Sequence, residues 1–344
     1  MNSIFNSANP ITLESGLSIP SYHLAYTTYG SLNEKKDNVI WIFHALTANS
    51  EPADWWAGLV GKGKLFDPET YFIVCVNTPG SCYGSIGPLD LNPETNEPYY
   101  HDFPFFTPRD MIRSYQPLKN YLGIKKIKVG IGGSMGGQQL LEWAIEEPDL
   151  FENIFPIATN ARHSAWGIAF NAAQRMSIEA DSTWVEKQPN AGIEGMKAAR
   201  SIALISYRHY ETYHISQSEH HLEKVDNYKS ESYQKYQGEK LAKRFNAFSY
   251  YFLSKSMDSH NVGRGRGGIE NALQQIRSRT MVLGIHTDIL FPVSEQEFIA
   301  QNVPNGKFTA INSLYGHDGF LLEFEQIEEI ISSFLRAEKN DTAG

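Results

Sequence analysis

The stretch VGIGGSMGG, residues 129–137, gathers five glycines around a single serine, Ser134. Glycine loses more conformational entropy on folding than any other residue, so this crowding indicates a place where backbone geometry excludes side chains. The alternating run IKVGI precedes the serine, and apolar residues at helical spacing follow it. A Gly-x-Ser-x-Gly motif between a strand and a helix predicts a nucleophile elbow, a strained turn that exposes the serine hydroxyl. Gly132 and Gly136 are the glycines of this motif.

Apolar segments of strand length recur along the chain, and several are continuous, as in parallel strands that are buried on both faces. They lie at residues 38–43, 71–76, 125–131, 153–157, 280–285 and 307–311. Helical patterns separate them, notably at 109–121, 138–147 and 326–335. The alternation predicts the α/β class, with a mostly parallel sheet flanked by helices.

Between residues 165 and 275 the strand pattern stops, and helical segments rich in Tyr, His, Lys and Glu follow, as at 193–205 and 233–257. We interpret residues 1–164 and 276–344 as the α/β core and 165–275 as an inserted helical lid. The alternative is an independent helical domain that takes no part in the chemistry. The final residues, KNDTAG, are expected to be disordered.

Composition excludes several classes of partner. The formal net charge is -9 and the pI is about 5.7, which disfavours binding to nucleic acid or to an anionic membrane. The first residues lack the pattern of a secretory signal, and the chain has no run of about 18 apolar residues, so a cytoplasmic protein is expected. The only cysteines, Cys75 and Cys82, indicate neither a disulfide framework nor a metal site, and we expect no metal. Cys75 is expected in the core.

A reactive serine needs a base, and the base needs a carboxylate that fixes its tautomer. Asp288 in HTDILFP follows the segment 280–285, and His317 in YGHDGF follows the last predicted strand. The order serine, acid, histidine predicts a triad of Ser134, Asp288 and His317. The alternatives are a helix cap for Asp288 and a surface loop for His317. His286 is the less favoured base because it precedes the acid.

A tetrahedral intermediate needs two backbone N–H donors, one of them from the residue after the nucleophile. Met135 is therefore predicted as the first donor. Leu46, in the loop after the first predicted strand, is predicted as the second. His44 is expected to hold this loop rather than to react.

A second glycine-rich stretch, GRGRGG, satisfies the pattern G-x-G-x-x-G, but no strand precedes it, so we expect no dinucleotide site. Its arginines, Arg264 and Arg266, are either solvated, which is the commoner outcome, or contact the phosphates of a ligand at the edge of the lid.

Longer segments resemble the signature segments of the homoserine O-acetyltransferase family of the α/β-hydrolase superfamily. They are HALTANSEPADWWAGLVGKGKLFD, NTPGSCYGSIGP with NPETNEPYYHDFP, GGSMGGQQLLEWA, TNARHSAWGIAFNAAQR, TDILFP and YGHDGFLLE. The resemblance implies transfer of an acyl group from acyl-CoA, with acetyl-CoA as the expected donor, to the side-chain hydroxyl of L-homoserine, an early step towards methionine. It implies a ping-pong mechanism with Ser134 as nucleophile, His317 as base and Asp288 as its orienting acid. It also implies a homodimer packed through the lid, and no cofactor besides the acetyl-CoA co-substrate.

The resemblance also implies three substrate-binding residues. The substrate arginine of the family matches Arg200, its lid tyrosine matches Tyr207, and the aspartate after the catalytic histidine matches Asp318. Arg200 would bind the carboxylate of the amino-acid acceptor, and Asp318 would pair with its ammonium group.

The chain departs from the family at two places. Gly-Ser-Cys at 80–82 replaces the common Gly-Gly-Cys, and Ala-Asn at 48–49 replaces Gly-Asp. We expect Ser81 to lie near the acyl group, which leaves the donor open. Acetyl is favoured because no extra arginine stands out for a succinyl carboxylate. The alternatives are a succinyl-CoA-dependent or serine-directed transferase, an esterase with the same triad, and a non-catalytic receptor of this fold.

Overall fold

The computed structural model describes residues 2–221 and 223–341. Within them, eight strands form one sheet in the order β1-β4-β6-β5-β7-β8-β9-β10, and β2 pairs with β3 separately. The strands are β1 Asn2–Ser7, β2 Ile11–Thr12, β3 Ser18–Ile19, β4 Tyr22–Tyr29, β5 Val39–Phe43, β6 Phe72–Val76, β7 Ile127–Gly133, β8 Phe151–Ile157, β9 Arg279–Ile285 and β10 Gly306–Ile311. The six strands predicted from the sequence form one parallel block, so the predicted α/β class is confirmed.

Strands β1 and β4 were not predicted from the sequence. They pair antiparallel to each other, and β4 joins the parallel block through β6. The sequence of β1, NSIFNS, mixes polar and apolar residues, as an edge strand does, and lacks the continuous apolar character of the other strands.

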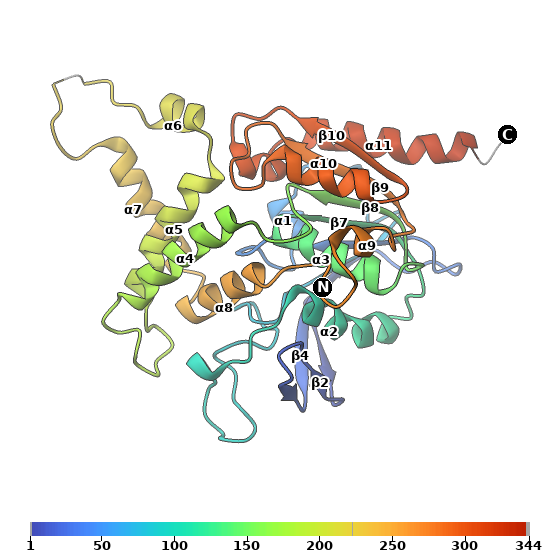
Figure 1. The fold of residues 1–344 in the computed structure, drawn as a ribbon, viewed down its shortest axis with the longest axis horizontal. Helices are drawn as coiled ribbons and strands as arrows, with labels where there is room; N and C mark the ends of the chain where they lie inside the picture. The colour runs from blue at the N-terminus through green and yellow to red at the C-terminus, as the bar shows by residue number, and fades with distance from the viewer. Residues whose placement is uncertain (1, 222, 342–344) are drawn as a thin grey trace.

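Helices connect and cover these strands (Figure 1). They are α1 Pro52–Trp55, α2 Pro108–Tyr121, α3 Met135–Glu146, α4 Ala165–Glu179, α5 Ile193–Tyr207, α6 Tyr210–Gln217, α7 Lys229–Ala242, α8 Ala247–Asp258, α9 Ile269–Leu273, α10 Val293–Asn302 and α11 Phe324–Asp341, with the 3₁₀ helices η1 Tyr100–Asp102 and η2 Gly316–Leu321. Because α11 continues to Asp341, the expected disorder is wrong for residues 339–341, whereas 342–344 lie outside the described residues. In the described part of the chain, no helix has the length and apolar character needed to cross a membrane.

One helical prediction needs correction. The pattern at 233–257 is two helices, because α7 ends at Ala242 and α8 begins at Ala247. The break has a local cause: the side chain of Asn246 accepts a hydrogen bond from the backbone N–H of Ser249 at 2.7 Å and so caps a new helix.

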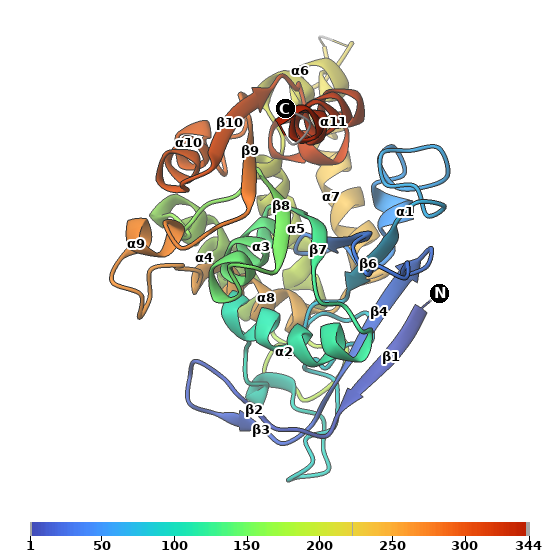
Figure 2. The ribbon, with the colours of Figure 1, turned by 90° about the vertical axis from the view of Figure 1, so that its right-hand side faces the viewer.

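The core lies on both faces of the sheet. In β5, Val39, Trp41 and Phe43 pack into one apolar cluster with α2 and α3, whereas Ile40 and Ile42 pack into a second cluster with α11. Figure 2 shows the sheet between these helices. All five side chains are at most 3% exposed, and each fully buried large side chain contributes about 1.5–3 kcal/mol. Cys75 is also fully buried here, as predicted.

Helices α4–α8, called the lid helices below, follow the carboxyl end of β8. They lie to one side of the sheet (Figure 1), and the described residues between β8 and β9 form no strand. Since functional sites of parallel sheets form at the carboxyl ends of the strands, the lid helices lie where they can cover one.

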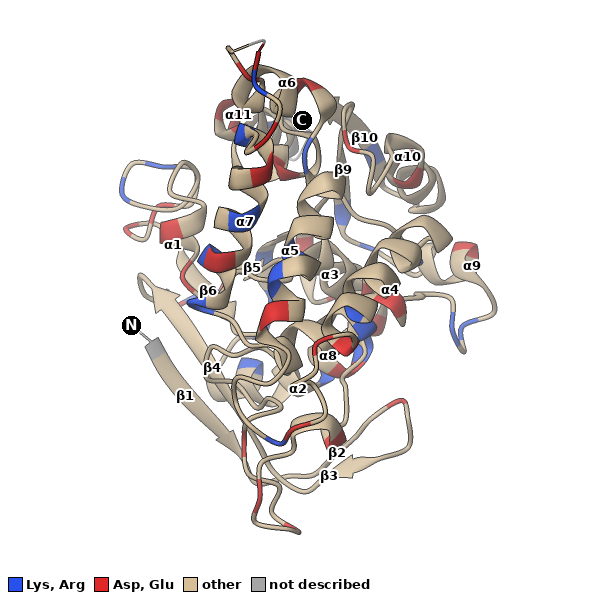
Figure 3. Cartoon of the chain, turned by 90° about the vertical axis from the view of Figure 1, so that its left-hand side faces the viewer, with Lys and Arg blue, Asp and Glu red and all other residues tan. Residues whose placement is uncertain are grey.

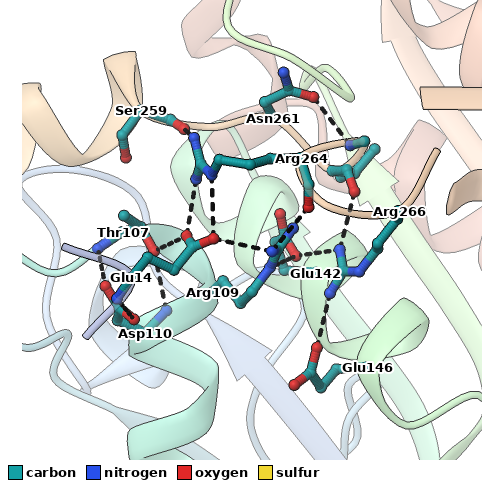
Figure 4. A network of polar contacts seen from close by, with 12 residues as sticks. Glu14, Thr107, Arg109, Asp110, Glu142, Glu146, Ser259, Asn261, Arg264 and Arg266 are labelled. Carbon is teal, nitrogen blue, oxygen red and sulfur yellow. Dashed lines mark hydrogen bonds and ion pairs between the residues drawn. The ribbon is translucent and has the colours of Figure 1, made fainter. Parts of the chain in front are cut away.

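The arginines of GRGRGG are bound to carboxylates. Arg264 donates two hydrogen bonds to Glu14, at 3.1 and 2.8 Å, and Arg266 contacts Glu142 at 2.7 Å and Glu146 at 2.8 Å (Figure 4). The suggestion that these arginines contact ligand phosphates is therefore wrong, because carboxylates of the protein already occupy their donors. The absence of a strand before this loop, which follows α8, agrees with the prediction.

Arg109 of α2 completes this network inside the core. It is 7% exposed and donates to Glu14 at 2.9 Å and to Glu142 at 3.1 Å (Figure 4). Glu142 of α3 thus lies between two guanidinium groups, those of Arg109 and Arg266, and joins the core to the loop after α8. A buried carboxylate in this position is costly to remove because Arg109 remains buried and Arg266 remains only partly exposed.

We predict that Glu142→Gln lowers the free energy of unfolding by about 3 kcal/mol, because it leaves Arg109 and Arg266 without their shared carboxylate. Urea denaturation measures this change. Asp149→Asn is the matched control, since it breaks the exposed pair with Arg277 and should cost under about 1 kcal/mol. Equal midpoints for wild type and Glu142→Gln would show that the network does not stabilise the fold.

Candidate active site

The glycines of the elbow are required by close approach of the backbone. A Cβ on Gly136 would lie 2.2 Å from the carbonyl oxygen of Phe43, and one on Gly132 would lie 2.6 Å from the backbone of Gly136. Between them, Ser134 joins β7 to α3 with φ 56° and ψ -125°, a strained conformation for a residue with a side chain. The hydroxyl of Thr159 donates to the Ser134 carbonyl at 2.8 Å and helps to hold this turn.

His317 and Asp288 form the predicted acid–base pair. Nδ1 of His317 lies 2.7 Å from Oδ2 of Asp288, and the other carboxylate oxygen accepts the backbone N–H groups of Leu290 and Phe291 at 2.8 and 2.9 Å. The capping alternative for Asp288 is wrong, because Leu290 and Phe291 lie in the turn before α10, and α10 begins after Pro292 without a side-chain cap. His317 is 3% exposed, which excludes the surface-loop alternative, whereas His286 is exposed.

The surroundings of His317 set its proton affinity. Burial lowers its pKa, but the charge and hydrogen bond of Asp288, together with the charge of Asp318, outweigh burial and hold the pKa above the usual 6.5. The ring stacks on Phe291 with centroids 5.0 Å apart. Because Nδ1 is bound to Asp288, Nε2 is the nitrogen left for substrate chemistry.

A cavity of about 530 Å³ brings most predicted site residues together. Its lining includes Leu46, Ser134, Arg200, Tyr207, His317 and Asp318. Asp288 lies behind His317 and does not line it, and the buried side chain of Met135 also points elsewhere. Among the described contacts, no hydrogen bond joins Ser134 Oγ to His317; the two residues share the cavity wall.

The loop after β5 is held by His44. Nε2 of His44 accepts the backbone N–H of Thr78 at 2.9 Å, so in the neutral ring Nδ1 carries the proton and donates to the Ala45 carbonyl at 2.8 Å. The Ala48 N–H donates to the same carbonyl at 3.0 Å. In a trans peptide the N–H points opposite to the C=O, so these bonds also fix the direction of the Leu46 N–H.

Burial lowers the pKa of His44 to about 4, so its ring is neutral at physiological pH. This confirms the prediction that His44 holds the loop. Within the described residues, the backbone N–H groups of Leu46 and Met135 have no acceptor. Met135 is also the first residue of α3, where a helix leaves its N–H groups free.

Helix α5 with its C-cap residue and the 3₁₀ helix η2 contribute a second group of charged residues to the cavity. The Arg200 guanidinium lies 5.6 Å from the ring centroid of Tyr207, and no carboxylate of the described residues pairs with it. Oδ2 of Asp318 lies 2.9 Å from Nε of Arg208 in an ion pair without hydrogen-bond alignment. Burial raises the pKa of Asp318 despite the opposing charges of Arg208 and Arg200.

Sequence reasoning missed Arg208, which also lines the cavity. The available signal was its position directly after Tyr207, at the end of α5. The expectation for Ser81 is wrong, since this buried serine does not line the cavity, whereas Ala48 and Asn49 do.

The cysteine and metal expectations concern other chemistry near the site. Burial raises the pKa of Cys82 to about 11, so its thiol is no competing nucleophile. No group of three or more His, Cys, Asp or Glu residues in the described ranges could hold a metal ion.

Comparison with known proteins gives consistent findings. Residues 38–324 match the family profile described as the alpha/beta hydrolase fold. A homoserine O-acetyltransferase of Cyclobacterium marinum is 51% identical over 331 residues, which cover 96% of this chain and 94% of that protein. The crystal structure of homoserine O-acetyltransferase from Bacillus anthracis has a TM-score of 0.89 and 23% identity, covering 97% of both chains. An acetylester hydrolase from Corynebacterium glutamicum has a TM-score of 0.86 and 22% identity, covering 98% of this chain and 96% of that one. A transferase and a hydrolase therefore share this fold.

We predict that NMR titration finds a His317 imidazole pKa above 6.5, and a lower one in Asp288→Asn. The variant removes the two largest contributions that raise the pKa, whereas burial, which lowers it, remains. His317 should therefore become neutral at lower pH in Asp288→Asn than in the wild type. An equal or higher pKa in the variant would show that Asp288 does not set the proton affinity of His317.

Proposed function

The chain belongs to the homoserine O-acetyltransferase family of the α/β-hydrolase superfamily, and we propose that it transfers an acetyl group from acetyl-CoA to the side-chain hydroxyl of L-homoserine. One observation carries the proposal: the cavity of Ser134 and His317 also holds an unpaired guanidinium and a buried carboxylate. An ester hydrolase has no need of such a pair, whereas an amino-acid acceptor carries the two complementary charges.

The acceptor is bound by the lid and by the loop that carries the base. Arg200 binds the carboxylate of homoserine, since its guanidinium faces the cavity with no carboxylate partner in the described part of the chain. Asp318 accepts the ammonium group through Oδ1, while Oδ2 remains beside Arg208. Tyr207 lies between these groups, 5.7 Å from the His317 ring centroid, and helps to set the distance between acceptor and base.

In the first half-reaction, His317 Nε2 takes the proton of the Ser134 hydroxyl as Oγ bonds to the thioester carbonyl carbon. The negative charge of the tetrahedral intermediate is stabilised by the N–H groups of Leu46 and Met135. As the intermediate collapses, the carbon–sulfur bond breaks and the leaving sulfur takes the proton from His317. CoA departs and the acetyl group remains on Ser134.

In the second half-reaction, His317 takes the proton of the homoserine hydroxyl, whose oxygen bonds to the acetyl carbon. The bond to Ser134 Oγ then breaks, and the serine recovers its proton from His317. Water is the competing nucleophile at this stage, so a transferase benefits from a cover over the acyl-enzyme. The lid helices, with residues 165–275 as the proposed insertion, supply that cover.

Methionine synthesis follows as the proposed pathway, because O-acetylation activates the homoserine side chain for substitution. The cytoplasmic location and the homodimer through the lid stay predictions. The lid helices do expose apolar side chains suited to an interface, namely Trp166, Met176, Ile205 and Ile215.

We predict that steady-state thiol release from acetyl-CoA, beyond one equivalent per active site, requires L-homoserine, is slower with L-serine or succinyl-CoA, and falls at least about 10³-fold in Ser134→Ala. A thiol-reactive dye measures the release. Ser81→Ala is the matched control, because it removes a buried serine outside the cavity. Sustained turnover without any acceptor would contradict the proposal in favour of the hydrolase, and near-normal turnover in Ser134→Ala would exclude the mechanism.

We predict that His44→Phe lowers kcat for acetyl transfer roughly tenfold to a hundredfold and leaves the KM for homoserine nearly unchanged, because the Leu46 N–H loses its orientation. Steady-state kinetics separate the two effects. His44→Asn should lose less, since its amide nitrogen lies where Nδ1 lies in histidine and can still donate to the Ala45 carbonyl. An unchanged kcat in His44→Phe would show that the loop keeps its geometry without the ring.

A further inference from the structure

The cavity that holds Ser134 is lined by more positive than negative side chains, although the whole chain has a formal charge of -9. The lining cations are Arg200, Arg208, Lys240 and Arg244, and the lining carboxylates are Asp54 and Asp318. Arg208 and Asp318 neutralise each other in their ion pair. The remaining positive charge therefore lies mainly on Arg200 and on the pair Lys240 and Arg244.

Lys240 and Arg244 lie on one face of a lid helix. Four of the residues that line the cavity are Gln237, Lys240, Leu241 and Arg244. Residues three or four positions apart lie on the same side of a helix, so these four mark one side of α7 and of the turn after it. The helical turn continues to Arg244, because its N–H donates to the Leu241 carbonyl at 3.0 Å. Figure 3 shows α7 beside α5, with basic residues on both helices.

The guanidinium of Arg244 is held in place without being neutralised. Its Nη1 donates to the carbonyl oxygen of Thr47 at 2.6 Å and to the hydroxyl of Tyr83, and both acceptors are uncharged. Lys240 has no ion pair or hydrogen bond among the described residues. Arg244 is therefore an oriented cation and Lys240 a free one. No carboxylate among the described residues pairs with either charge.

We propose that Lys240 and Arg244 bind the phosphate groups of the acyl donor. This inference rests on the proposed function only in taking an acetyl group carried by CoA as the donor. The acetyl thioester itself is uncharged, so the anions that the donor brings are the phosphates at the far end of its long chain. Two uncompensated cations, one of them a planar guanidinium, suit phosphate oxygens.

The position of Arg244 agrees with this path. Thr47, which accepts its hydrogen bond, directly follows Leu46, the proposed oxyanion donor. The arginine therefore lies on the side of the cavity where the thioester carbonyl is held and its chain leaves. Arg200 lies by Tyr207 and His317, on the side assigned to the acceptor. In this proposal the donor and the acceptor contact different cations.

Calorimetric binding of free CoA and of pantetheine, which lacks phosphate, tests this inference without turnover. We expect Lys240→Gln and Arg244→Gln each to raise the Kd of CoA roughly tenfold, the effect of losing one charged hydrogen bond, and to leave pantetheine binding unchanged. Salt should weaken CoA binding more in the wild type than in Lys240→Gln. Lys243→Gln is the matched control, because Lys243 is an exposed neighbour that does not line the cavity.

Two results would overturn the inference. One is a failure of the comparison with the control, either because CoA binding is unchanged in Lys240→Gln or because Lys243→Gln weakens it equally. The other is unchanged CoA binding with a loss of kcat/KM confined to succinyl-CoA, which would assign the cations to an acyl carboxylate. A protein whose CoA binding depends on Lys240 but which acetylates no homoserine would contradict the proposed function and still support the phosphate contacts.

Discussion

The contact on which the site depends is the approach of Gly136 to the end of β5. Phe43 is the last residue of that strand and pairs in register with Gly132 of β7. A side chain on Gly136 would overlap the Phe43 carbonyl, so glycine lets the start of α3 lie against the loop that carries Leu46. The register of these two neighbouring strands thereby places the loop after β5 beside the first turn of α3.

The charged groups around Ser134 are arranged so that each buried charge has a counterpart. Asp288 divides its oxygens between the local turn and His317, and Asp318 lies beside Arg208. The exceptions are the cations of the lid, which face the cavity without carboxylates. These cations are exposed or half-buried at the cavity wall, where water reaches them and where an anionic ligand can replace that water.

Local patterns predicted most of the fold and of the site. The parallel strands, the elbow and the loops of Asp288 and His317 follow from apolar runs and from the residues after them. Strands β1 and β4 were missed because their sequences, NSIFNS and YHLAYTTY, mix polar and apolar residues without a continuous apolar run. Arg208 and Arg244 were missed because a lid arginine resembles any solvated one in a sequence. Ser81 was placed wrongly for a different reason. Distances between loops depend on packing, which a single sequence does not display.

The connection between β8 and β9 has a consequence for how the protein is made. The helices of the lid are inserted after the strand that adjoins the elbow, and Asp288 and His317 come only after them. During synthesis the serine therefore emerges long before its acid and its base. With the proposed triad, an incomplete chain carries a hydroxyl of ordinary reactivity, and Ser134 gains its activation only when β9 and β10 join the sheet after the lid helices have been made.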